Sequence, residues 1–199
     1  MNTFYPILFA LMALFFLGIG VHVIAKNRPL FLSSKYFFAF MVLTFSPQFV
    51  NSYNFFSLET TANLQFIMLL NPIMFICLLV FFWFQMKGYM AIGVNDESFR
   101  DALHFSLAKN NLPFEEQLST IKLTSLNTSL QIAIQSWIGV GQYKLKKSKD
   151  SQVLMKITEG LNEYYINNSV NANKITSIFY IVIGIFMLIS AVAFSKVFS

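Results

Sequence analysis

The two histidines are the side chains of this sequence whose charge can change near neutral pH, and they lie far apart along the chain. His22 lies near the end of the first apolar segment, close to Lys26. It can sense pH, make a polar contact between membrane helices, or simply lie among lipid headgroups. His104 follows Leu103 in an amphipathic stretch, which is typical of a histidine at a protein surface. Because two isolated histidines supply too few ligands, we predict no metal site.

Three further groups resemble chemical motifs only in part. Glu115 and Glu116 are adjacent, so their side chains point to different faces and cannot share one proton as a catalytic carboxylate pair does. The segment from Gly139 to Gly141 lacks the further glycine, the lysine and the helix of a phosphate-binding loop, and it is typical of a bend between strands. Cys77 lies in an apolar run, which indicates a packed side chain. We therefore predict no catalytic residue, no cofactor and a protein that is not an enzyme.

A basic cluster follows the last predicted strand and consists of Lys144, Lys146, Lys147 and Lys149. Anionic lipid headgroups attract such clusters with about 1 kcal/mol per basic residue. Lysines also keep an exposed strand from pairing with another sheet. Lipid contact and a solvated sheet edge both remain open. We predict no nucleic-acid binding, because aromatic residues do not alternate with these lysines.

Polar residues interrupt two of the apolar segments, at Pro47 and Gln48 in one and at Asn71 and Pro72 in the other. Proline removes a helical hydrogen bond and kinks the helix, and an amide side chain in lipid needs a hydrogen-bond partner. Two kinked helices of this kind can line a small pathway. Alternatively, Asn71 and Gln48 bond to each other and hold the helices together.

The elements that position these residues follow from the composition. Of 199 residues, 56% are hydrophobic and only 12% are charged, whereas a soluble domain usually carries about 25% charged residues. A helix needs about 20 apolar residues to cross a bilayer. We predict three transmembrane helices within residues 1–86, at about 4–25, 36–56 and 64–86, and a fourth within 175–199. The second contains Ser46-Pro47-Gln48, so a re-entrant or interfacial helix is its alternative.

The basic residues predict the orientation of these helices. Among the fourteen Lys and Arg residues, all but Lys196 fall in the first loop or in residues 87–174. Because positive charge accumulates on the cytoplasmic side, both termini are expected outside and residues 87–174 in the cytoplasm. The richness in Phe, Asn, Ile, Ser and Lys indicates an AT-rich genome, and we expect a bacterial inner (plasma) membrane.

Residues 87–174 form the long polar segment and predict a small soluble domain. The apolar segment 89–94 indicates one strand, and alternating residues near 121–125, 130–136 and 142–146 indicate three more in an antiparallel sheet. Helical periodicity begins after Asn95 and recurs at 151–166. We also expect a short helical turn at 115–118 and a flexible, Asn-rich link at 167–173. The predicted order is β-α-β-β-β-α, a two-layer α+β sandwich with both helices on one face of the sheet.

The sequence therefore predicts a polytopic α-helical membrane protein with four transmembrane helices and an inserted α+β cytoplasmic domain. Its expected function is that of a non-enzymatic accessory, sensor or assembly protein whose domain binds a protein partner or a second copy of the chain. The alternative is a subunit of a small homo-oligomeric channel or transporter, in which Asn71 and Gln48 would contribute to a pathway. The expected partners are the lipid bilayer and a protein or homo-oligomer.

Overall fold

The computed structural model describes residues 4–56, 62–117, 119–146, 151–168 and 170–197, without the side chains of 47–69 and 71. The chain forms two compact units. One comprises Met1–Ser33 with Gly88–Ser199, and the other comprises Ser34–Lys87.

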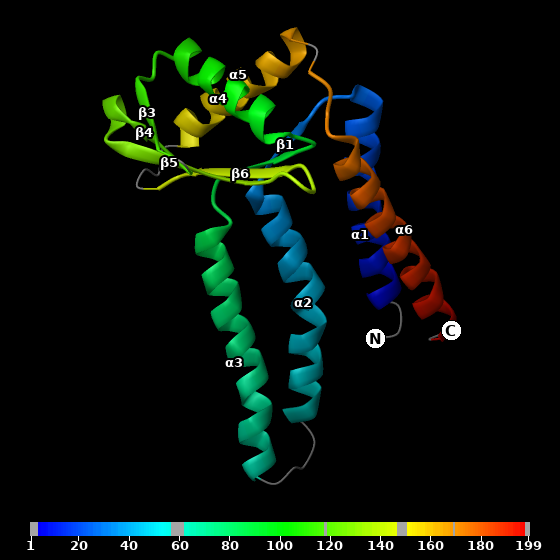
Figure 1. Cartoon of the computed structure of the whole chain (residues 1–199). Coiled ribbons are helices and arrows are strands. Elements are labelled where there is room, and N and C mark those ends of the chain that lie inside the picture. The colour runs from blue at the N-terminus through cyan, green and yellow to red at the C-terminus, as the bar shows by residue number, and fades with distance from the viewer. Residues whose placement is uncertain (1–3, 57–61, 118, 147–150, 169, 198–199) are drawn as a thin grey trace. The chain divides into compact units, whose positions relative to one another are not determined.

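The first unit contains most of the elements drawn in Figure 1. Their bounds are α1 (Phe4–Lys26), β1 (Leu30–Ser33), β2 (Tyr89–Ile92), α4 (Asp96–Lys109), β3 (Phe114–Gln117), β4 (Thr120–Leu123), the 3-10 turn η1 (Thr124–Leu126), β5 (Thr128–Gln135), β6 (Val140–Leu145), α5 (Ser151–Asn167) and α6 (Lys174–Val197). The second unit contains α2 (Ser34–Phe56) and α3 (Ala62–Gln85).

Helices α1 and α6 pack against each other along their length. Their ring contacts join Phe9 to Phe194 and Phe16 to Tyr180, so residue numbers rise along α1 as they fall along α6. The helices are therefore antiparallel, and the beginning of α1 lies beside the end of α6 in Figure 1. A Cβ added at Gly20 would lie 2.7 Å from Ile181 Cγ1, so glycine at this position lets the helices approach closely.

Among the described residues, α1 and α6 are the two helices long and apolar enough to cross a membrane. Helix α2 begins beside Lys35 and its second half carries several Ser, Gln and Asn residues. The apolar helix found within α3 runs from Pro72 to Gln85, which is shorter than the ~20 residues that a span needs. The prediction of four transmembrane helices is therefore wrong for the described part of the chain, which supports two.

Six strands form one antiparallel sheet in the order β1-β2-β6-β5-β4-β3. Strands β2, β4, β5 and β6 lie where the sequence predicted strands, but the predicted layout β-α-β-β-β-α is wrong because β1 and β3 were missed. The short helical turn predicted at 115–118 is wrong, since Phe114–Gln117 is strand β3. The two missed strands are the edges of the sheet, and each is held by pairing with one neighbour, β2 or β4.

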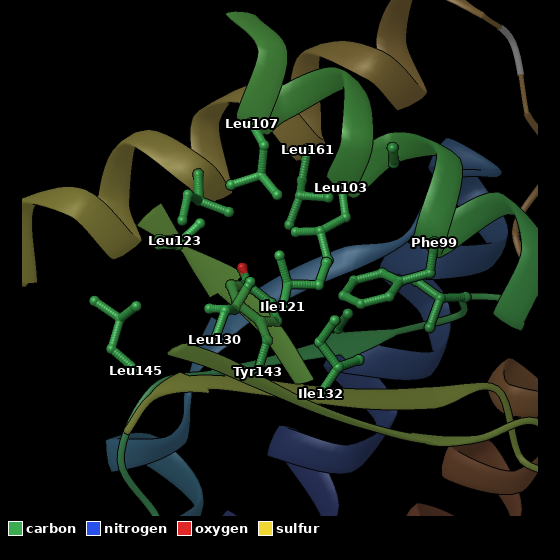
Figure 2. Close-up of a cluster of buried hydrophobic side chains, with 14 of the residues drawn as sticks. Phe99, Leu103, Leu107, Ile121, Leu123, Leu130, Ile132, Tyr143, Leu145 and Leu161 are labelled. Carbon is green, nitrogen blue, oxygen red and sulfur yellow. The ribbon is translucent and has the colours of Figure 1, made fainter. Parts of the chain in front are cut away.

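The core of the first unit lies between the sheet and the helices α4 and α5, which both cover the same face (Figure 1). Figure 2 shows Phe99, Leu103 and Leu107 of α4 pointing toward the sheet, and all three are fully buried. Tyr143 of β6 and Leu161 of α5 lie in the same cluster. Each of these α4 residues is four positions from the next, so one stripe of the helix faces the core.

The second unit is a helical hairpin. Phe38 of α2 contacts Trp83 of α3, and Phe45 contacts Phe75, with ring centroids 5.2 and 4.8 Å apart. The pairing again runs in opposite directions, so α2 and α3 are antiparallel. Pro72 lies inside α3.

Candidate functional site: the junction of the helix pair and the domain

The segment that leads from α5 into α6 is bonded to the domain. The backbone N–H of Ala172 donates to the carbonyl of Asn27 (3.2 Å), and that of Asn173 donates to the carbonyl of Gly93 (2.9 Å). The side chain of Asn27 donates to Asn171 Oδ1. The expectation of a flexible link at 167–173 is therefore wrong for its described residues. Its polar groups find fixed partners on the segments that follow α1 and β2.

Asn27 explains why α1 ends here. Its φ of 49° lies in the left-handed region, which asparagine tolerates better than most residues and which ends many helices. The chain then turns through the buried Pro29 into β1, so the end of α1 lies beside the edge of the sheet.

A turn between β5 and β6 forms the second part of the junction. The hydroxyl of Thr176, in the first turn of α6, donates to the carbonyl of Ile138 (2.6 Å). The carbonyl of Gly139 accepts bonds from the N–H groups of Gly93 and Val94, at 2.8 and 3.0 Å. Gly139 has φ +63°, and a Cβ there would lie 2.2 Å from Thr176 Oγ1. Glycine is therefore needed both for the backbone conformation and for the close approach of α6.

Trp137 lies in the same turn and is 74% exposed, so it does not belong to the domain core. Its neighbour Ile138 is bonded to the first turn of α6. Tryptophan favours the headgroup layer of a membrane, where one part of its ring is wet and another lies in apolar surroundings. An exposed tryptophan beside the start of an apolar helix is consistent with that location.

A cavity of about 360 Å³ lies beside the end of α1, bounded by that helix, the loop that follows it, β1 and α5. Its polar lining comes from His22, Lys26 and Arg28 on one side and from Thr158, Glu159 and Asn162 of α5 on the other. Its apolar lining comes from Pro29, Leu30, Phe31, Tyr89, Met155 and Ile166. Of the side chains singled out in the sequence, only His22 lines this cavity.

The cavity has a positive charge that the described part of the protein does not neutralise. Lys26 and Arg28 are exposed and take part in none of the four ion pairs among the described residues. Glu159 is the one acid in the lining. In the sequence, Lys26 and Arg28 stand out only as charges that set membrane topology, and no local pattern indicates that they line a cavity.

Two buried tyrosines of the core make side-chain hydrogen bonds, and one of them bonds to Thr158 of the cavity lining. Tyr143 Oη and Thr158 Oγ1 are hydrogen-bonded at 2.8 Å, and Tyr165 Oη lies 3.2 Å from Ser98 Oγ. Burial raises the pKa of Tyr165 to about 12 and raises the pKa of Tyr143 further still. Both phenols therefore stay neutral at physiological pH, and they act as structural hydrogen-bonding groups.

His104 and the glutamate pair lie on the surface of the domain. His104 Nε2 is 2.8 Å from Glu116 Oε2, and its ring stacks on Phe114. Glu116 also pairs with Arg100. In strand β3, Glu115 and Glu116 are neighbours and project to opposite faces of the sheet, as the sequence indicated. The cluster joins α4 to β3.

The basic cluster at the end of β6 lies away from the junction. Lys144 and Lys146 are four and six positions beyond Val140, which corresponds to about 13 and 20 Å along a strand. Strand β6 lies between β2 and β5, so Lys144 is not on an edge strand, and the interpretation as a solvated sheet edge is wrong for this residue. Lys147 and Lys149 lie outside the described residues, and lipid contact stays a prediction.

The polar residues of α2 and α3 belong to the second unit. Pro72 is half-buried within α3. The side chains of Pro47, Gln48 and Asn71 lie outside the described part of the structure, so neither the pathway nor the packing prediction is tested.

No group of three or more potential metal ligands occurs among the described residues. Comparison with known proteins gave no matching family model, no matching curated protein and no matching solved structure.

Proposed function

We propose that this chain is a non-enzymatic membrane protein whose α+β domain is held at the membrane surface and binds a protein partner or a second copy of the chain. The observation that carries the proposal is the junction. The domain is bonded to the end of α1 through Asn27 and to the start of α6 through Thr176. A domain fixed to two apolar helices in this way changes its position when the helices move, which suits an accessory, sensor or assembly role.

The charges at the junction support a cytoplasmic domain. Lys26 and Arg28 follow the apolar part of α1, and Lys174 begins α6, so all three lie at the domain end of the antiparallel pair. Lys196 lies at the opposite end of α6. By the positive-inside rule, the domain end faces the cytoplasm and both termini lie outside. With the composition of the chain, this favours a bacterial inner membrane.

The proposal is tested by crosslinking the tagged full-length protein in intact membranes, extracting it gently and measuring the identity and ratio of what co-purifies. A partner in fixed ratio, or a homo-oligomer that conducts no solute in liposomes, is expected. The same assembly should weaken in a Thr176→Val variant, because that change loosens the domain from α6 without altering the domain surface.

A closed homo-oligomer that does conduct solute would support the channel or transporter alternative instead. In that case Asn71→Leu should abolish the flux while the assembly stays intact. A monomer that co-purifies with no protein at all would contradict both functions.

A further inference from the structure

We propose that the cavity beside the end of α1 binds a phosphate group, with Lys26 and Arg28 as its principal contacts. This goes beyond the binding of a protein partner proposed above and does not depend on it. The phosphate can belong to a membrane phospholipid or to a small soluble phosphate ester, and the two sources share the same recognition chemistry.

The lining of the cavity carries a net positive charge. Lys26 is the last residue of α1, Arg28 lies in the loop that follows, and both line the cavity. Neither is neutralised by an ion pair within the described residues. Guanidinium and ammonium groups are the side chains that bind phosphate oxygens best, the guanidinium through two parallel hydrogen bonds. One carboxylate, Glu159, faces two fixed positive charges, so the lining stays net positive.

The neutral polar side chains of the lining include hydrogen-bond donors that suit a phosphate. Neutral His22 can donate one hydrogen bond, and Asn162 can donate two. Both therefore complement oxygen atoms of a phosphate or of a neighbouring hydroxyl. Thr158 already bonds to Tyr143 and to the carbonyl of Leu154, which fixes this part of the wall.

The volume and the apolar part of the cavity suit a small ligand that has both a phosphate and an apolar group. A volume of about 360 Å³ is at the small end of ordinary ligand pockets, which suits a headgroup or a short ester and not an extended cofactor. Met155 and Ile166 supply apolar surface in the same cavity. A ligand with a phosphate and an adjoining apolar part fits this division of the lining.

The position of the cavity along α1 also favours a phosphate ligand. The cavity lies at the end of α1, one of the two helices that are apolar enough to cross a membrane. In a spanning helix this end reaches the headgroup layer, where phosphate is abundant. Basic residues at a helix end also attract headgroups without any specific site, so the experiment has to separate these two effects.

The experiment measures phospholipid bound to the full-length protein after gentle extraction from vesicles of phosphatidylglycerol and phosphatidylethanolamine, by native mass spectrometry. The variants are Lys26→Gln with Arg28→Gln, and the matched control is Lys174→Gln. Lys174 is an exposed basic residue at the same end of the helix pair but does not line the cavity. A parallel arm measures binding of inorganic phosphate and glycerol phosphate to the detergent-purified protein.

We expect the double variant to lose bound lipid by at least about tenfold, because charged hydrogen bonds are lost, while Lys174→Gln keeps it. Binding of the soluble phosphates, with the same dependence on Lys26 and Arg28, would support the site and assign the soluble source. Equal loss in Lys174→Gln, or no loss in the double variant, would overturn the proposal, because binding would then be non-specific or elsewhere.

A second variant keeps the proposal testable if removal of both charges disturbs folding. Met155 lines the cavity, is 49% exposed and carries no charge. Met155→Trp fills the space and leaves Lys26 and Arg28 in place, so it should lower the bound phosphate by a similar factor. Unchanged binding in this variant would show that the cavity is not where phosphate binds.

Discussion

The core of the domain and its junction with the helix pair are built from different interactions. The core consists of large apolar side chains that are fully buried between the sheet and the helices α4 and α5. The junction consists of hydrogen bonds to backbone carbonyls, with glycines where the chains approach most closely. Burial of apolar area determines whether a domain folds, whereas a few directional bonds determine how a folded domain is held. Changes in the core should therefore unfold the domain, and changes at the junction should release it while it stays folded.

The largest effect is expected from Leu103→Ala. Leu103 is fully buried in the core, and its truncation should lower the free energy of unfolding by about 2–5 kcal/mol because it removes apolar contacts and leaves a cavity. The measurement is denaturant unfolding of the detergent-solubilised protein followed by circular dichroism. Phe105→Ala on the same helix is the control, since Phe105 is 37% exposed and should cost less. Equal losses from the two variants would contradict the proposed core.

A second loss of stability is expected from a substitution at the contact between α4 and α5. A Cβ at Gly160 would lie 2.3 Å from Ser106 Oγ and 2.8 Å from Ser106 Cβ, so Gly160→Ala should separate the helices and cost about 1–3 kcal/mol. In a Ser106→Gly background the same change should cost less, because both of these atoms are gone. A double-mutant cycle of unfolding free energies measures the difference. Strict additivity would show that the helices do not meet at this pair.

A smaller loss of stability, confined to the junction, is expected from Thr176→Val. Thr176→Val removes the bond to the carbonyl of Ile138 and should cost about 0.5–1.5 kcal/mol locally. Amide hydrogen exchange of Ala172 and Asn173, whose N–H groups are bonded across the junction, should become faster. Exchange in β5 should stay slow. Faster exchange throughout the sheet would mean that junction and core unfold together, which would contradict the view that they are stabilised separately.

The smallest structural change is expected from glycine substitutions between α1 and α6. Gly18 has no atom within 4 Å of an added Cβ, whereas Gly20 faces Ile181. Gly18→Ala should therefore leave the spacing of α1 and α6 unchanged, and Gly20→Ala should widen it. Crosslinking of Phe9→Cys to Phe194→Cys by a short bifunctional thiol reagent in a Cys77→Ala background reports the spacing, because these two rings stack across the helix pair. Equal crosslinking of both glycine variants would contradict the close contact at Gly20.

The edge strands show where local sequence patterns stop being informative. Strands β4, β5 and β6 contain the alternation of apolar and polar residues that a half-buried strand requires, β2 is a short apolar run before Gly93, and both domain helices have an apolar stripe. Strand β3 reads Phe-Glu-Glu-Gln, which has no such alternation, and it forms because it pairs with β4. Strand β1 pairs with β2, from which it is separated by all of α2 and α3.

The candidate site depends on that unpredicted pairing. Leu30 and Phe31 of β1 line the cavity, and the pairing of β1 with β2 brings the basic loop after α1 toward α5. The sequence drew attention to His22 but treated Lys26 and Arg28 only as topology signals. Nothing local to these residues indicates that α5, more than a hundred positions later, supplies the opposite wall.

The sequence by itself determined the apolar character of α1 and α6, the two amphipathic helices of the domain and four of its strands. Each of these follows from the pattern of apolar residues within one segment. Only the tertiary structure decided the edge strands, the bonded junction at Gly139 and Thr176, and the cavity at Lys26 and Arg28. These features arise from contacts between segments far apart in the chain, and such contacts leave no periodic signal in either segment alone.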